Sequence, residues 1–161
     1  MFKLFKNKNE VELNAFVEGI TRDIKLVDDI MFSQELIGRG IAIKPSSNKI
    51  VAPAEGTILM VFPTNHALGI QLENGIELLI HIGIDTVKLK GEGFKAFVQE
   101  GQHVRKGELL VEVNFDYVKQ NGYQEDVLMV VTTPKETYSI EYPVYEKSVG
   151  KKDKVLTVTK L

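Results

Sequence analysis

The chain has 161 residues, of which 43% are apolar and 26% are charged, and its formal net charge at pH 7 is −2. These values fit one globular domain and argue against a nucleic-acid-binding protein, because the sequence carries no basic stripe. The absence of cysteine excludes disulfides, cysteine-ligated zinc and cysteine nucleophiles, and no apolar run reaches the roughly 18 residues of a membrane span. A cysteine-free chain without a secretion signal fits a reducing compartment, so we expect a cytoplasmic protein.

The first residues form a basic, amphipathic pattern in which Phe2, Leu4 and Phe5 alternate with lysines. A pattern of this kind is able to contact an anionic membrane surface weakly, whereas chain ends are more often solvated and frayed. Both interpretations remain open for residues 1–8. We expect residues 1–13 to form a flexible tail and residues 14–161 to form one domain.

The body of the chain consists of short runs rich in Val and Ile, separated by turn signals such as residues 45–48, 73–75 and 91–93. This spacing predicts an all-β fold, a compact antiparallel β-sandwich of jelly-roll or Greek-key type. At most short helices are expected, one of them around residues 28–36. Residues 15–19 (AFVEG) resemble residues 52–56 (APAEG), and either a duplicated β element or ordinary turn chemistry explains this similarity.

Two of the three histidines lie on the arms of a predicted hairpin, PTNHALGIQLENGIELLIHIG. A two-residue turn at Asn74-Gly75 would place His81 opposite Leu68 and His66 diagonally beside it, on one face of the sheet. The apolar residues of the two arms favour a register shifted by one residue, which would separate the histidines. A bulge at Gly69 would reconcile the two patterns.

A close pair of histidines suits three kinds of chemistry. Neutral imidazoles bind zinc, and an imidazole next to a carboxylate such as Asp85 works as a general acid or base. Alternatively, His81 could take up a phosphoryl group whose oxygens are bound by His66 and Thr64, with apolar neighbours that exclude water. A buried core histidine is the fourth explanation for His81, and we expect His103 to lie in an exposed loop.

The residues around both histidines resemble a known family. The stretch GIELLIHIGIDTVKLKGEGF is similar to the phosphorylation-site signature of the glucose-family enzyme IIA of the bacterial phosphoenolpyruvate-dependent sugar phosphotransferase system. The resemblance continues in VDDIMFSQELIGRGIAIKPSSNKIVAPAEGTI, in TNHALGI and in EGQHVRKGELL, and it spans roughly residues 14–135. It implies an antiparallel β-sandwich of the duplicated hybrid-motif type that works without a cofactor.

The resemblance also implies a role for each residue of the pair. The residue at the position of His81 accepts a phosphoryl group from the histidine-containing phosphocarrier protein and passes it to a cysteine of a sugar-specific IIB domain. The residue at the position of His66 stabilises the phosphoryl group, and the one matching Thr64 orients His66. The alternative is a purely regulatory protein that docks on transporters or enzymes, or one that holds zinc between His66, His81 and a partner's carboxylate.

The family docks its partners on a surface next to these histidines. The resemblance implies that Asp29 and Asp85 ring the site and meet a basic partner. The apolar residues matching this surface, here called the docking patch, are Ile30, Met31, Phe32, Leu36, Ile37, Phe62 and Leu79. For Ile37 in particular, a place in the core is the competing interpretation.

Overall fold

The computed structural model describes residues 8–142 and 145–161, and within them the predicted all-β sandwich is confirmed. The strands are β1 Glu10–Asn14, β2 Gly19–Asp23, β3 Arg39–Pro45, β4 Lys49–Val51, β5 Gly56–Val61, β6 Ala67–Leu72, β7 Glu77–Ile82, β8 Phe94–Ala96, β9 His103–Val104, β10 Leu109–Val113, β11 Val127–Val131, β12 Tyr138–Glu141, β13 Ser148–Val149 and β14 Lys154–Lys160. An eight-stranded sheet has the order β13-β2-β3-β11-β7-β6-β5-β9, and two three-stranded sheets have the orders β1-β14-β12 and β4-β10-β8. Neighbouring strands are antiparallel throughout these sheets.

Short helices connect the strands. They are η2 Ile24–Leu26, α1 Ile30–Ser33, η3 Thr86–Leu89, α2 Phe115–Gln120 and η4 Lys135–Thr137. The helix expected around residues 28–36 is therefore present as α1. Helix α2 was not predicted from the sequence, although Asn114 is a typical N-cap whose side chain accepts from the Tyr117 backbone N–H at 3.0 Å.

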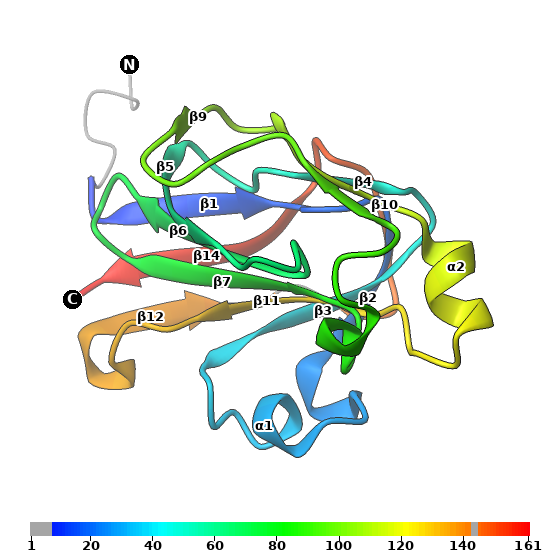
Figure 1. The fold of residues 1–161 in the computed structure, drawn as a ribbon. Helices are drawn as coiled ribbons and strands as arrows, with labels where there is room; N and C mark the ends of the chain where they lie inside the picture. Colours follow the sequence, from blue (N-terminus) through cyan, green and yellow to red (C-terminus); the bar gives the residue numbers. More distant parts are fainter. Residues whose placement is uncertain (1–7, 143–144) are drawn as a thin grey trace.

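Strand β11 divides two apolar clusters. Val127, Met129 and Val131 belong to the larger cluster, which forms the core between the sheets, whereas Leu128 and Val130 point into a smaller cluster on the other face. That smaller cluster also contains Phe32 of α1, and Figure 1 shows α1 on the outer side of β3. A run of five buried residues, VLMVV, is expected where a strand is covered on both faces.

The hairpin formed by β6 and β7 has a register different from the predicted one. Its loop has three residues rather than two, because Leu72 N–H donates to the Ile76 carbonyl at 2.8 Å and Gly75 takes a φ of +89°. His81 consequently pairs with Ala67, not with Leu68. The apolar pattern therefore predicted the register correctly, and the two-residue turn was wrong.

The predicted bulge lies next to Gly69, but not in this hairpin. The register between β6 and β7 is regular, whereas the pairing of β5 with β6 shifts between Ile58 and Met60. Met60 is the residue that pairs with Gly69 beyond the shift. The bulge thus lies on the neighbouring strand and does not account for the position of the histidines.

The predicted tail is too long. Residues 10–13 belong to β1, which pairs with β14 from Glu10 opposite Thr159 onward. The side chain of Leu13 is buried in the core, and this burial explains why the segment is not a free tail. The predicted membrane contact of residues 1–8 falls almost wholly outside the described residues.

The two similar segments found in the sequence lie beside each other. Asn14 N–H donates to the Pro53 carbonyl at 2.9 Å, and Val51 N–H donates to the Phe16 carbonyl at 2.8 Å. Each segment ends in a glycine that begins a strand, Gly19 in β2 and Gly56 in β5. This equivalence favours a duplicated β element over chance turn chemistry.

Candidate functional site

His81 lies near the end of β7, on the face that carries the smaller apolar cluster. It pairs with Leu128 of β11. Both Leu128 and Leu79, which lies two residues before His81 on β7, contribute to that cluster. The ring of Phe32 lies over it, with ring centroids 4.9 Å apart. Because this face is covered only in part, by the short elements η2 and α1, the imidazole stays partly exposed among apolar side chains. His81 is therefore not a core histidine.

The turn after β7 determines which nitrogen of the neutral His81 ring carries the proton. Its Nδ1 lies 2.8 Å from the Gly83 carbonyl oxygen, and because a carbonyl only accepts, Nδ1 carries the proton. The neutral ring therefore has its lone pair at Nε2. Gly83 has a φ of +74°, and a Cβ there would lie 2.4 Å from Thr86 Cγ2, so only glycine fits this turn. The Thr86 hydroxyl donates to the Ile82 carbonyl and fixes the turn from its other side.

His66 lies in the turn before β6, and its ring meets the His81 ring edge to face, with centroids 5.1 Å apart. Its backbone carbonyl accepts from Ile82 N–H at 2.7 Å. Since His66 precedes the strand, the strict alternation of strand side chains does not govern its direction, and the two rings meet despite the shifted register. The Thr64 hydroxyl is hydrogen-bonded to His66 Nδ1, and the Phe62 ring lies 5.3 Å from the His66 ring.

Burial keeps both rings neutral. It lowers the pKa of His66 to about 4, with a further contribution from the neighbouring His81. Burial also lowers the pKa of His81, against the opposing effects of the Gly83 hydrogen bond and the charges of Asp29 and Asp85. The Thr64 hydroxyl can donate to Nδ1 of His66, and a neutral ring then carries its proton on Nε2. In that arrangement the site combines one imidazole with a lone pair and one with an N–H donor.

The two predicted acidic residues differ in what they do locally. Asp29 is the N-cap of α1, and its Oδ1 accepts from Met31 N–H at 2.9 Å, which stabilises the helix start. Asp85 is exposed and takes a left-handed φ of 60° just before η3. Both carboxylates act on His81 electrostatically, so the structure brings them to the site as expected.

The docking patch divides into exposed and supporting residues. Ile30, Met31 and Leu36 are 65%, 47% and 59% exposed, which is unusual for such apolar side chains. Phe32 is buried, and Ile37 and Leu79 pack on the smaller cluster, so the competing core interpretation of Ile37 is partly correct. The half-buried Phe62 packs on His66 instead.

Two exposed apolar residues near these elements were not singled out from the sequence. Leu26 of η2, which packs beside α1, is 61% exposed, and Val87 of η3, two residues after Asp85, is 49% exposed. Leu26 follows Lys25, and Val87 precedes Lys88. An apolar residue in such a charged, short connection is the signal that could have found them.

His103 occupies a different environment. It lies on β9, the edge strand that β6 and β5 separate from β7, and its side chain is 55% exposed. Its Nε2 contacts the Glu55 carboxylate at 2.6 Å. The prediction for His103 is confirmed in its exposure, but the residue lies on the edge strand β9 rather than in a loop.

The described residues 8–142 and 145–161 contain no group of three or more His, Cys, Asp or Glu side chains arranged to hold a metal ion. Two imidazoles leave further zinc ligands to be supplied from elsewhere. The zinc site with a partner's carboxylate therefore stays a prediction. Within the same residues, no helix has both the length and the apolar character needed to cross a bilayer.

Comparisons with known proteins agree on one family. The sequence pattern of the family described as phosphoenolpyruvate-dependent sugar phosphotransferase system, EIIA 1, matches residues 11–137. Among solved structures, the glucose permease IIA from Mycoplasma capricolum is similar, with 33% sequence identity and a TM-score of 0.85. That similarity covers 95% of this chain and 97% of the other.

Proposed function

The chain belongs to the EIIA 1 family of the phosphoenolpyruvate-dependent sugar phosphotransferase system, and we propose that it carries phosphoryl groups on His81. The donor is the histidine-containing phosphocarrier protein, and the acceptor is the cysteine of a sugar-specific IIB domain. The transfer drives uptake and phosphorylation of the sugar. The observation that carries this proposal is the Nδ1 hydrogen bond of His81 to the Gly83 carbonyl, which leaves Nε2 with the lone pair.

In the accepting step, the Nε2 lone pair of His81 attacks the phosphorus atom of the donor's phosphohistidine. A new P–N bond forms while the donor's P–N bond breaks, and the electron pair of the broken bond stays on the donor's imidazole nitrogen. No proton has to leave His81, because Nε2 starts without one. The Gly83 carbonyl favours the product as well, since Nδ1–H becomes a stronger donor when the ring carries the phosphoryl group.

His66 stabilises the phosphoryl group by donating its Nε2–H to a phosphoryl oxygen. The supporting observations are the ring contact with His81 and the hydrogen bond with Thr64, whose hydroxyl donates to Nδ1 in the tautomer that this role needs. The lowered pKa of His66 keeps the ring a neutral donor at pH 7. A neutral donor stabilises the phosphoryl group without trapping it, which suits a carrier that must also release it.

Both partners dock on the exposed part of the docking patch, around Ile30, Met31 and Leu36, extended by Leu26 and Val87. Apolar residues at the centre and carboxylates such as Asp29 at the rim have the composition of a short-lived interface. When a partner covers the patch, it excludes water and protects the P–N bond from hydrolysis. We propose that the protein carries out this transfer in the cytoplasm, the location that the sequence predicts.

The test is phosphoryl transfer from labelled phosphoenolpyruvate, through the general proteins of the system, to three forms of the chain. Wild type and His103→Ala should each take up one acid-labile, base-stable phosphoryl group. The His81→Ala variant should take up none, because it lacks the accepting nitrogen. Normal labelling of His81→Ala would refute the assignment of the acceptor.

A further inference from the structure

A short segment, residues 124–126, holds the turn that orients His81. It precedes β11 and extends the pairing of β11 with β7 beyond the end of the strand. Gly83 N–H donates to the Asp126 carbonyl at 2.9 Å, and Ile84 N–H donates to the Gln124 carbonyl at 3.1 Å. The Gly83 carbonyl, which accepts from His81 Nδ1, therefore has its place fixed by this segment.

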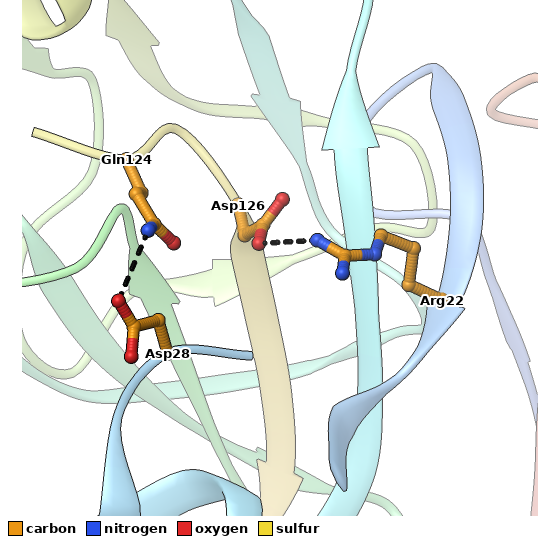
Figure 2. A network of polar contacts seen from close by, with 4 residues as sticks. All are labelled: Arg22, Asp28, Gln124 and Asp126. Atoms are coloured by element: carbon orange, nitrogen blue, oxygen red, sulfur yellow. Dashed lines mark hydrogen bonds and ion pairs between the residues drawn. The ribbon is translucent and has the colours of Figure 1, made fainter. Parts of the chain in front are cut away.

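The side chain of Asp126 anchors the segment toward β2, away from β7. It is 6% exposed and pairs with Arg22 Nη1 of β2 at 2.9 Å (Figure 2). Burial raises the pKa of Asp126, and the Arg22 charge opposes this shift, so the ion pair offsets part of the cost of burying the carboxylate. Arg22 pairs with Ala42 of β3, and the same row continues through Leu128 to His81.

The same segment is also tied to the residues before α1. Gln124 Nε2 donates to Asp28 Oδ2 at 3.3 Å, and Figure 2 shows this contact pointing away from the ion pair. Asp28 directly precedes the N-cap of α1, whose Phe32 ring contacts His81. Both the hydrogen-bond partner of the imidazole and the helix that packs on it thus depend on residues 124–126.

We propose that the Arg22–Asp126 ion pair is a positioning device for phosphoryl transfer: it fixes residues 124–126 and, through them, the Gly83 carbonyl that keeps the His81 lone pair on Nε2. The role rests on the proposed function of His81. Neither residue touches the reacting atoms, and the carboxylates that act on His81 electrostatically are Asp29 and Asp85. Removing the pair therefore changes the position of a carbonyl rather than the charge at the site.

The first test is the tautomer of His81 in the full chain, read from the nitrogen NMR shifts of the isotope-labelled ring at about pH 7.5, where both rings are neutral. In Asp126→Asn, the ratio of the Nε2–H to the Nδ1–H tautomer should rise about five-fold, the factor that corresponds to weakening one hydrogen bond. Glu125→Gln is the matched control, because it makes the same change one residue earlier and breaks a 3.5 Å pair with Lys119 instead. Equal tautomer ratios in the two variants would overturn the proposal.

Variants of Arg22 provide an independent route if Asp126→Asn does not fold. The Arg22 side chain is 29% exposed, so Arg22→Gln loses the charge at a site that water reaches. Its Nε2–H tautomer should rise as in Asp126→Asn, and Arg22→Lys, which keeps the charge, should restore the wild-type ratio in large part. A wild-type ratio in Arg22→Gln would contradict the proposal.

The second readout separates this inference from the proposed function. With the phosphocarrier protein as donor, Asp126→Asn should lower the maximal rate of phosphoryl uptake in proportion to the Nδ1–H fraction lost in the NMR measurement, because only that fraction of His81 is competent, and it should leave the half-saturating donor concentration unchanged. A shifted tautomer with an unchanged rate would refute the catalytic part of the inference. If wild type accepts no phosphoryl group at all, the proposed function fails, while the NMR comparison still decides whether the ion pair positions the ring.

Discussion

The regions around His81 and His103 place the same side chain in two different environments. Both residues lie on strands of the eight-stranded sheet, and both have an oxygen acceptor within hydrogen-bond distance. At His81 the acceptor is a backbone carbonyl bound to Nδ1, in an apolar setting. At His103 it is the carboxylate of Glu55, bound to Nε2 in solvent. Only the first arrangement leaves Nε2 with a lone pair beside a second imidazole.

The difference lies in the backbone around each ring rather than in the ring itself. Two residues after His81, Gly83 takes a positive φ and turns its carbonyl back to the ring, whereas Gly101, two residues before His103, takes a similar φ in open space. The nucleophilic role proposed for His81 relies on a fixed acceptor, a covered apolar face and a neighbouring donor. His103 does not combine these three features.

The largest effect is expected when the neighbouring donor is removed. His66→Ala should still accept a phosphoryl group on His81, but its onward transfer to a IIB domain should fall about a hundred-fold to a thousand-fold, as when a preorganised donor to a transition state is lost. His66→Gln, whose amide replaces the N–H, should recover part of that loss. The measurement is single-turnover transfer from the isolated phosphoprotein. A wild-type rate in His66→Ala would remove His66 from the mechanism.

A second prediction compares the two glycines. Gly83→Ala should lower the free energy of unfolding by about 3 kcal/mol or more, because the strained φ is combined with a Cβ 2.4 Å from Thr86 Cγ2 and 3.0 Å from the Gln124 carbonyl. Gly101→Ala has a φ of +86° but no atom within 4 Å of its Cβ, so it should cost about 1 kcal/mol. Urea unfolding measures both. Equal losses would mean that the turn after β7 is no tighter than an open one.

A third prediction concerns the pH dependence of stability. The pKa of His66 is lowered from 6.5 to about 4 by folding, so the unfolded chain binds more protons between these values and stability falls as the pH drops through 6.5. The loss levels off below about pH 4. For this one residue we expect about 2 kcal/mol between pH 7 and pH 5. His66→Gln should lack that part of the slope, measured by urea unfolding at both pH values. A slope as steep in the variant as in wild type would show that His66 protonates freely in the folded protein.

The smallest effect is expected at the docking patch. Leu36→Ala should raise the half-saturating concentration of the phosphocarrier protein about five-fold, the size expected when one exposed contact residue is truncated. Its maximal rate should not change. Phe97→Ala serves as the control, because Phe97 is 43% exposed but follows β8, which belongs to the sheet β4-β10-β8 and not to the eight-stranded sheet. Equal effects of the two variants would argue that docking does not use α1.

Much of the site could be predicted because its signals are local. The short helix near residue 30 follows from its N-cap Asp29. The assignment of Thr64, His66 and His81 to one site follows from the resemblance of a long motif to a known family, and not from strand geometry. The register of the hairpin was harder, because Asn74-Gly75 is compatible with loops of two or three residues and only the Leu72–Ile76 pairing distinguishes them.

Other features had no local signal. The meeting of the two rings depends on a turn that places His66 outside the strand, where alternation no longer applies. The burial of Phe32, in contrast to its neighbours Ile30 and Met31, depends on which side of α1 faces the sheet, and four residues are too few to show a helical period. The ion pair of Arg22 and Asp126 joins residues 104 positions apart, which only the strand order brings together.

The most direct test of the account is the site of the phosphoryl group within the phosphoprotein. Phosphorus and nitrogen NMR of the isotope-labelled chain distinguishes phosphorylation at Nε2 from that at Nδ1 and assigns it to one of the three histidines. The account predicts a single phosphoryl group on Nε2 of His81, with Nδ1 still protonated and bonded to the Gly83 carbonyl. A phosphoryl group on Nδ1 of His81, or on His66 or His103, would contradict it.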